Sequence, residues 1–154
     1  MKSQEITAVF TGSFDPFTIG HDSIVRRALP LFHQLVIGVG INSHKNCMYT
    51  LDQRIQAITE LYADEPKISV KAFGDLAVAF ARREHAHYII KGVRSVKDFE
   101  YERQQADINR QIGGIETLLL CTEPQLSSVS SSLVRELLNF GTDPTPFLPR
   151  RKQP

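Results

Sequence analysis

The chain has 154 residues, of which 18 are basic and 17 acidic, and its formal net charge is +1 at pH 7. This length suits one domain with a substantial core and is too short for two ordinary domains. The near balance of charge gives no indication of a nucleic-acid or membrane partner. No apolar run approaches roughly 18 residues, and residues 1–5 lack the apolar core of a signal peptide, so we expect a cytoplasmic protein.

Five apolar runs, rich in β-branched or large side chains, predict strands at residues 6–10, 35–39, 68–72, 88–90 and 116–121. Helical spacing lies between and after them, at residues 22–29, 51–62, 75–83, 96–110 and 131–139. Asp52 and Asp75 stand where helix starts favour acidic residues, and Gly114 and Gly141 stand where helices end. This alternation predicts a single-domain α/β fold, with a doubly wound, five-stranded parallel sheet covered by helices on both faces.

The two cysteines, Cys47 and Cys121, fit neither a disulfide framework nor a metal-ligand spacing. Free cysteine usually behaves as a small hydrophobic residue. We therefore expect Cys121 to be a buried strand residue and Cys47 to be an incidental loop thiol.

The segment at residues 11–21 connects the first strand to the first helix and must turn the chain. Gly12 allows close approach of the backbone to a ligand, Pro16 fixes a turn, and Gly20 leaves space beside His21. In an open α/β sheet this is where a phosphate site is built, and a histidine at the helix entrance can donate to an anion.

Four further loops follow the other predicted strands, at residues 42–49, 74–77, 91–94 and 127–132. Ligands of open α/β sheets bind beyond the carboxyl ends of the strands, near the point where the strand order switches. We therefore expect these loops and residues 11–21 to converge on one ligand site.

Gly-Ser-Phe-Asp-Pro at residues 12–16, followed by Thr-Ile-Gly-His at residues 18–21, resembles the first signature of the nucleotidyltransferase superfamily, which has a Rossmann-like fold. Three more segments, at residues 45–51, 91–102 and 129–135, narrow the resemblance. In this order and spacing the chain resembles the bacterial phosphopantetheine adenylyltransferase family. The resemblance covers residues 1–149 as one nucleotidyltransferase domain and leaves residues 150–154 as a flexible basic tail.

That resemblance implies transfer of AMP from ATP to 4′-phosphopantetheine in coenzyme A biosynthesis, with dephospho-coenzyme A and pyrophosphate as products. It also implies Mg²⁺ accompanying ATP, a homohexamer and possible feedback by coenzyme A. Because the attacking phosphate is already ionised, catalysis requires positioning and positive charge more than a general base.

The resemblance assigns the catalytic roles to four side chains. His21 would contact the α-phosphate and stabilise the transition state, Ser13 would orient the attacking phosphate, and Lys45 would bridge the two reacting phosphates. Arg94 would contact the phosphates of ATP. The other histidines, at positions 33, 44, 85 and 87, are interpreted as surface or packing residues.

The implied ATP-binding residues come from three segments of the chain. They are Ser13, Phe14, His21, Gly92, Val93, Arg94, Glu102, Leu126, Ser127, Ser128, Val129, Ser130, Ser131 and Ser132. The serine run precedes a helix whose amino-terminal amides favour the β- and γ-phosphates. The implied acceptor-binding residues are Ser13, Lys45, Leu76, Ala77, Lys91 and Asn109.

The chain departs from the family pattern in two places that bear on binding. Lys91 stands where the family commonly has arginine, which keeps the charge and loses the bidentate fork. Leu126 stands where an aromatic residue is common. Asp98 and Glu100 are interpreted as a polar helix face, and no residues are assigned to direct metal ligation.

Two alternatives remain open on the sequence. Another small nucleotidyltransferase, acting on nicotinamide mononucleotide or carrying out cytidylyl transfer, would share the His21 motif and the serine loop but not residues 91–102. A nucleotide-sensing module would bind nucleotide without forming pyrophosphate.

Overall fold

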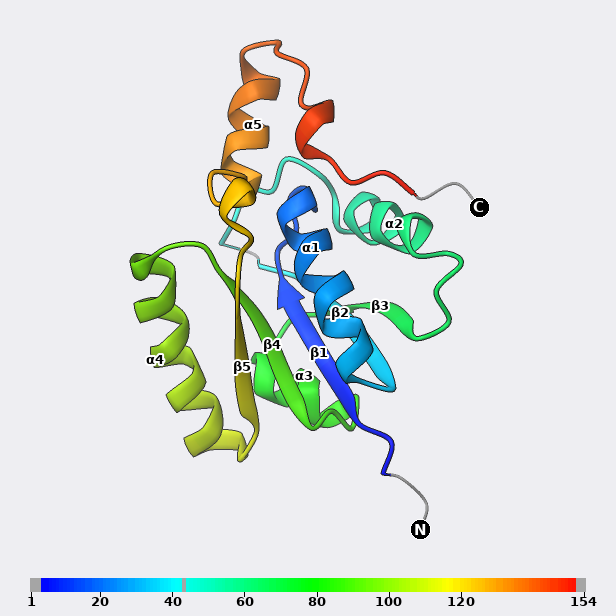
Figure 1. The fold of residues 1–154 in the computed structure, drawn as a ribbon, viewed down its shortest axis with the longest axis vertical. Helices are drawn as coiled ribbons and strands as arrows, with labels where there is room; N and C mark the ends of the chain where they lie inside the picture. Colours follow the sequence, from blue (N-terminus) through cyan, green and yellow to red (C-terminus); the bar gives the residue numbers. More distant parts are fainter. Residues whose placement is uncertain (1–3, 43, 152–154) are drawn as a thin grey trace.

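The computed structural model describes residues 4–42 and 44–151, and it contains one parallel sheet of five strands (Figure 1). The strands are β1 (Thr7–Gly12), β2 (Gln34–Gly40), β3 (Ile68–Phe73), β4 (Tyr88–Val93) and β5 (Glu116–Cys121). Their order in the sheet is β3-β2-β1-β4-β5, so the direction of strand addition reverses between β1 and β4. The predicted α/β fold with a five-stranded parallel sheet is confirmed.

The five helices are α1 (Ile19–Ala28), α2 (Leu51–Leu61), α3 (Ala77–Arg83), α4 (Val96–Gly113) and α5 (Ser131–Asn139). Three short 3₁₀ helices, η1 (Leu29–Leu31), η2 (Pro124–Leu126) and η3 (Thr145–Phe147), complete the described elements. In Figure 1, α5 lies beyond the carboxyl ends of the strands, where β1 points. Within residues 4–42 and 44–151, no helix combines the length and apolar character that crossing a membrane requires.

Both faces of the sheet are buried, because side chains of one strand alternate between two cores. Ala8 and Phe10 of β1 belong to the core that includes Ile24 of α1 and Ile58 of α2. Val9 faces the opposite core, which contains the α3 side chains Val78 and Phe80. The sequence of the central strand β1 is therefore largely a continuous apolar run, which is typical of parallel strands covered on both faces.

Local signals fix most helix ends. Thr18 and Thr50 accept hydrogen bonds from the third residue of α1 and of α2, and both helices begin with a full capping box. Gly114 ends α4 in the left-handed conformation, at φ 65°, which glycine adopts without steric cost. The predicted start of the third helix at Asp75 is wrong, because α3 begins at Ala77 and Asp75 instead pairs with the Arg83 guanidinium.

The structure corrects two further expectations, both about residues at the ends of strands. Cys121 is exposed, because it is the last residue of β5, an edge strand. Strand β4 extends to Val93, so residues 91–93 belong to the strand and only Arg94 follows it. In the predicted basic tail, Arg150 is exposed and the Arg151 guanidinium pairs with Asp64, while residues 152–154 lie outside the described residues.

Replacing Gly38 of β2 by alanine should destabilise the fold, because an added Cβ would lie 2.5 Å from Cε1 of Phe80. Overpacking of this kind typically costs about 1–3 kcal/mol of unfolding free energy, which chemical denaturation measures. Gly40→Ala is the matched control, because its nearest contact would be an ordinary 3.5 Å to the Gly12 carbonyl oxygen. Equal stability losses in the two variants would contradict the packing argument.

Candidate active site

A pocket of about 350 Å³ opens at the carboxyl ends of β1 and β4, the two strands between which the strand order reverses. This is the expected ligand position in an open α/β sheet. Its lining comes from the β1–α1 segment, Lys45, the end of β4, the first turns of α4, Thr122, and residues 129–135. Four of the five predicted loops thus contribute residues to this one pocket, whereas Leu76 and Ala77 of the fifth line a neighbouring pocket instead.

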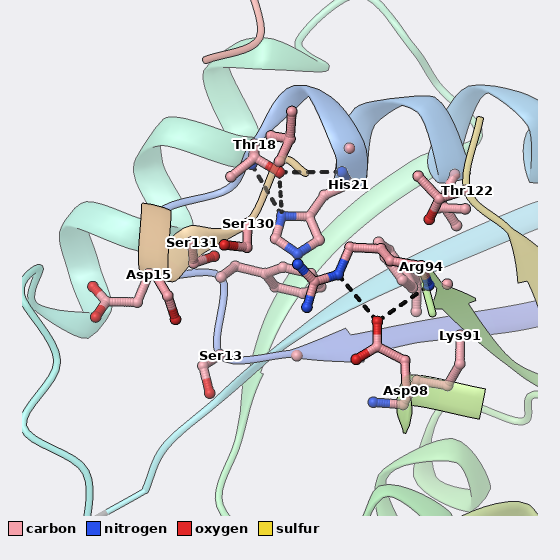
Figure 2. A pocket seen from close by; sticks show the side chains of 18 of the residues that line it. Ser13, Asp15, Thr18, His21, Lys91, Arg94, Asp98, Thr122, Ser130 and Ser131 are labelled. Carbon is pink, nitrogen blue, oxygen red and sulfur yellow. Dashed lines mark hydrogen bonds and ion pairs between the residues drawn. The ribbon is translucent and has the colours of Figure 1, made fainter. Parts of the chain in front are cut away.

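The start of α1 holds His21 in one orientation and one tautomer. The Thr18 backbone N–H donates to Nδ1 of His21 at 3.0 Å, and the His21 backbone N–H donates to the Thr18 hydroxyl at 3.4 Å. The ring also packs against Phe14 and Phe17, with ring centroids 5.0 and 5.2 Å away. Since Nδ1 accepts, the proton of the neutral ring lies on Nε2, and Figure 2 shows the ring extending into the pocket toward Arg94.

The imidazole of His21 is neutral at pH 7. Burial first, and then the nearby charges of Arg94 and Lys91, lower its pKa from 6.5 to about 4. Nε2–H is therefore a hydrogen-bond donor that carries no formal charge until negative charge arrives beside it. Capping and ligand binding use opposite nitrogens, so His21 can serve the helix and the pocket at once.

Lys45 and Ser13 meet across the pocket mouth. The Lys45 ammonium lies 3.4 Å from the Ser13 hydroxyl oxygen, although 32 residues separate them. The two side chains come from the loops after β2 and β1, which the parallel sheet brings side by side. A flexible ammonium and a hydroxyl at this separation can hold two oxygens of one phosphate.

Arg94 is held in place by Asp98. The Arg94 backbone N–H and its Nε each donate to Oδ2 of Asp98 at 3.1 Å (Figure 2). The interpretation of Asp98 as a plain polar helix face is wrong, because its carboxylate orients a cation of the pocket. Glu100 is exposed, as that interpretation expects.

Lys91 lies where the main pocket meets a second one. Its ammonium donates to the Thr11 carbonyl oxygen at 3.1 Å and lies 4.0 Å from Oε1 of Glu102. Burial lowers the pKa of Lys91 and raises the pKa of Glu102. Among the described residues, the Thr11 hydroxyl oxygen is the buried side-chain polar atom without a hydrogen-bond partner, and Thr11 lines the main pocket.

The second pocket, of about 130 Å³, is more apolar and lies between α3 and α4. Leu76 and Ala77 line one side of it, and Asn109 lies on the α4 side. Lys91 and Glu102 line both pockets, so a ligand with a phosphate and an extended arm can occupy the two together.

The serine segment divides into two parts. Ser130 caps α5 by accepting from the Leu133 backbone N–H at 3.0 Å, and Ser131 donates to the Pro16 carbonyl oxygen at 2.8 Å. Val129, Ser130, Ser131 and Ser132 line the main pocket. Leu126, Ser127 and Ser128 line neither described pocket, because η2 and the Ser127 hydrogen bond to Pro124 hold this turn away from it.

Most predicted site residues lie in one of the two pockets. The main pocket holds Ser13, Phe14, His21, Lys45, Lys91, Gly92, Arg94 and Glu102, together with residues 129–132. Val93 is buried and lines neither pocket. The sequence interpretation missed Asp15, Thr122 and Arg135, which also line the main pocket. Asp15 and Arg135 lie inside quoted motifs, and only the fold shows which atoms they hold.

No metal cage is formed by protein side chains in the part of the chain that the structure describes. His, Cys, Asp and Glu residues there make no group of three able to hold a metal ion. Asp98 already accepts from Arg94, and Glu102 lies beside Lys91.

Comparison with known proteins agrees with this geometry. The family model for cytidylyltransferase-like proteins matches residues 9–137. The bifunctional NMN adenylyltransferase/ADP ribose pyrophosphatase from Francisella tularensis shares the fold, with a TM-score of 0.72 and 15% identity over 97% of this chain and 46% of that one. The family model thus places the chain among nucleotidyltransferases of the cytidylyltransferase-like class.

Two curated relatives narrow the class. The phosphopantetheine adenylyltransferase of Phocaeicola vulgatus is 54% identical over 92% of this chain and 94% of its own length. The enzyme of the same name from Bacteroides fragilis is 50% identical over 93% of this chain and 95% of its own. The chain belongs to the phosphopantetheine adenylyltransferase family.

The ligand-free protein should show His21 as a neutral Nε2–H tautomer at pH 7, titrating near pH 4. Nitrogen-15 NMR of the imidazoles measures both properties, with exposed His87 as an internal reference. Between pH 6.5 and 4 the His21 imidazole is protonated in the unfolded chain but neutral in the folded one. Its contribution therefore lowers the free energy of unfolding as the pH falls through this range. Titration of His21 near 6.5 would contradict the assignment.

Proposed function

We propose that the chain transfers AMP from ATP to 4′-phosphopantetheine and releases pyrophosphate and dephospho-coenzyme A. The observation that carries the proposal is the neutral His21 donor surrounded by Lys45, Lys91 and Arg94, in a pocket that continues into a more apolar one. The relatives named phosphopantetheine adenylyltransferase support the choice of acceptor.

In the proposed reaction an oxygen of the acceptor phosphate attacks the α-phosphorus of ATP. The bond from that phosphorus to the bridging oxygen of the β-phosphate breaks, and its electron pair leaves with pyrophosphate. Negative charge grows on the α-phosphate oxygens, where Nε2–H of His21 would donate, and on the leaving group. No general base is required, because the attacking phosphate is already an anion.

The remaining groups position the two substrates. Lys45 and Ser13 would hold the attacking phosphate, since they lie 3.4 Å apart at the mouth of the pocket. Arg94 and the amino-terminal end of α5, capped by Ser130, would hold the β- and γ-phosphates. Mg²⁺ would accompany ATP through phosphate oxygens and water, and it would neutralise part of the charge that develops.

The acceptor would place its phosphate near Lys91 and its pantetheine arm in the second pocket. Leu76 and Ala77 offer apolar contacts there, and the Asn109 side chain offers an amide to the arm. Coenzyme A carries the same arm, so it would compete for this pocket. This is the structural basis on which we propose feedback.

A homohexamer is part of the same proposal. Helix α4 exposes the apolar side chains of Val96 and Phe99 near its start, with exposed fractions of 76% and 45%, whereas its exposed Ile108 and Ile112 line the second pocket. An apolar surface of this kind favours association with further copies of the chain. Light scattering at micromolar concentration tests the assembly, and a monomer would contradict it.

His21→Ala should lower the rate of pyrophosphate release by about 10²–10³-fold, because a donor aimed at the developing charge is lost. The assay contains Mg²⁺-ATP with 4′-phosphopantetheine, and parallel reactions replace the acceptor with nicotinamide mononucleotide. His87→Ala is the matched control, because His87 lies exposed directly before β4, at the amino ends of the strands and away from the pocket.

Release by the wild-type chain only with 4′-phosphopantetheine is the expected result. Release with nicotinamide mononucleotide alone would support another nucleotidyltransferase. Binding of ATP without release on either acceptor would support a nucleotide-sensing module. Full activity of His21→Ala would refute the role given to the imidazole.

Lys91→Ala should raise the KM for 4′-phosphopantetheine by about tenfold or more, because the lost ion pair with a phosphate is worth roughly 1.5–3 kcal/mol. The KM for ATP should change much less, since Arg94 and α5 would hold its phosphates. Steady-state kinetics measure both constants. Lys97→Ala, an exposed cation on α4, serves as the control, and equal changes in the two KM values would contradict the assignment.

A further inference from the structure

Asp15 is a buried carboxylate to which the proposed reaction gives no part. Its side chain is among the few buried charged ones, and the residue is 5% exposed. Oδ2 accepts from the Met48 backbone N–H at 2.8 Å, and Oδ1 accepts from the Tyr49 backbone N–H at 2.9 Å. Both oxygens therefore bind a loop that lies more than 30 residues further along the chain.

That loop carries Lys45, and the segment of Asp15 carries Ser13. Asp15 follows Ser13 by two residues, and Met48 follows Lys45 by three. The carboxylate thus joins the backbones that present the two groups lying 3.4 Å apart. The described residues of the loop between β2 and α2, 41–42 and 44–50, form no helix or strand themselves, so the position of the loop depends on such contacts.

A buried arginine reinforces the same connection. Arg54 of α2 is 6% exposed, and its Nη1 donates to the carbonyl oxygens of Ser13 at 2.7 Å and Gly40 at 3.1 Å. Its Nε donates to the Tyr49 carbonyl oxygen at 3.3 Å. On the other side, Arg135 donates to the Asp15 carbonyl oxygen at 2.8 Å.

The geometry favours a positioning role over direct chemistry. Figure 2 shows the Asp15 carboxylate pointing away from the His21 ring. Both of its oxygens accept from backbone amides, which leaves little capacity for a metal ion or a substrate proton. Each amide would lose its partner in a partly buried place if the carboxylate were removed.

We infer that Asp15 is a positioning residue that fixes Lys45 opposite Ser13 by clamping the backbone of Met48 and Tyr49. The inference rests on the proposed function for its kinetic consequence, and the clamp itself is a property of the fold. A misplacement of about 1 Å in a reacting constellation can cost about 10²-fold in rate.

Asp15→Asn tests the inference with nearly the same shape. The amide group would turn its NH₂ toward one of the two backbone N–H groups and would keep only one acceptor. We expect kcat to fall by about 10–100-fold with the KM for ATP changed by less than about threefold. Asp22→Asn is the control. Like Asp15, the Asp22 carboxylate accepts two hydrogen bonds, but its donors are the side chains of Tyr62 and Arg26 and it lies outside the pocket.

A double-mutant cycle separates positioning from general damage. If Asp15 acts through Lys45, Asp15→Asn should change kcat by less than about threefold in the Lys45→Ala background. An equal, additive loss in both backgrounds would overturn the inference. So would an unchanged kcat of Asp15→Asn alone.

Cys47 reports on the clamp without any assay of activity. This partly exposed thiol lies on the same loop, immediately before Met48, whereas the exposed Cys121 lies at the end of β5. Labelling with a thiol reagent, followed by mass spectrometry, should be at least about fivefold faster at Cys47 in Asp15→Asn, with Cys121 unchanged. Unchanged Cys47 labelling would overturn the clamp, whatever reaction the chain catalyses.

If Asp15→Asn does not fold, amide hydrogen exchange of the wild-type protein tests the clamp instead. The Met48 and Tyr49 amides should exchange slowly, because both donate to a buried acceptor. Exchange as fast as in an unstructured peptide would overturn the clamp. Slow exchange combined with a wild type that forms no pyrophosphate would support the clamp and refute only the proposed function.

Discussion

The site depends on a turn made directly after a strand that is buried on both faces. The chain leaves β1 at Gly12 and enters α1 at Ile19, and the polar groups between them must find partners inside the protein. Asp15 and Thr18 are buried there. The Asp15 carboxylate accepts from the loop between β2 and α2, Thr18 bonds to His21 of α1, and Arg54 reaches the Ser13 carbonyl oxygen from α2. The requirement to satisfy this turn thus also assembles the loops that line the pocket.

Charge in the pocket is arranged for an anion that binds at neutral pH. Burial first, and then the charges of Arg94 and Lys91, lower the pKa of His21, so the imidazole stays neutral beside two cations that would attract phosphate. A neutral donor costs less to bury than a third cation beside two others would. When negative charge develops on a phosphate at Nε2, the same imidazole becomes easier to protonate, and its hydrogen bond strengthens where the proposed transition state needs it.

The sheet and the convergence of its loops could be predicted from apolar runs and turn residues, because each strand is a local pattern. The start of α5 after Ser130 is local too, whereas α1 begins at Ile19, three residues before the predicted start at residue 22. The role of Asp98 could not be predicted, since nothing in an acidic helix start shows that it will orient Arg94. Asp15 is harder still, because its partners lie 33 and 34 residues away. The exposure of Cys121 could not be predicted either, because an apolar run does not reveal that its strand lies at the edge of the sheet.

Lys91 shows how the chain tolerates a buried ammonium at the boundary of two pockets. One of its three N–H donors meets the Thr11 carbonyl oxygen, and Glu102 supplies opposite charge at 4.0 Å. Burial favours the neutral form of each partner, while their mutual attraction favours the charged pair. Glu102 therefore compensates Lys91 without a close hydrogen bond, which leaves donors of the ammonium directed at the pocket. An arginine would reach further and bind in a fork, whereas this lysine keeps a compact charge at the boundary of the two pockets.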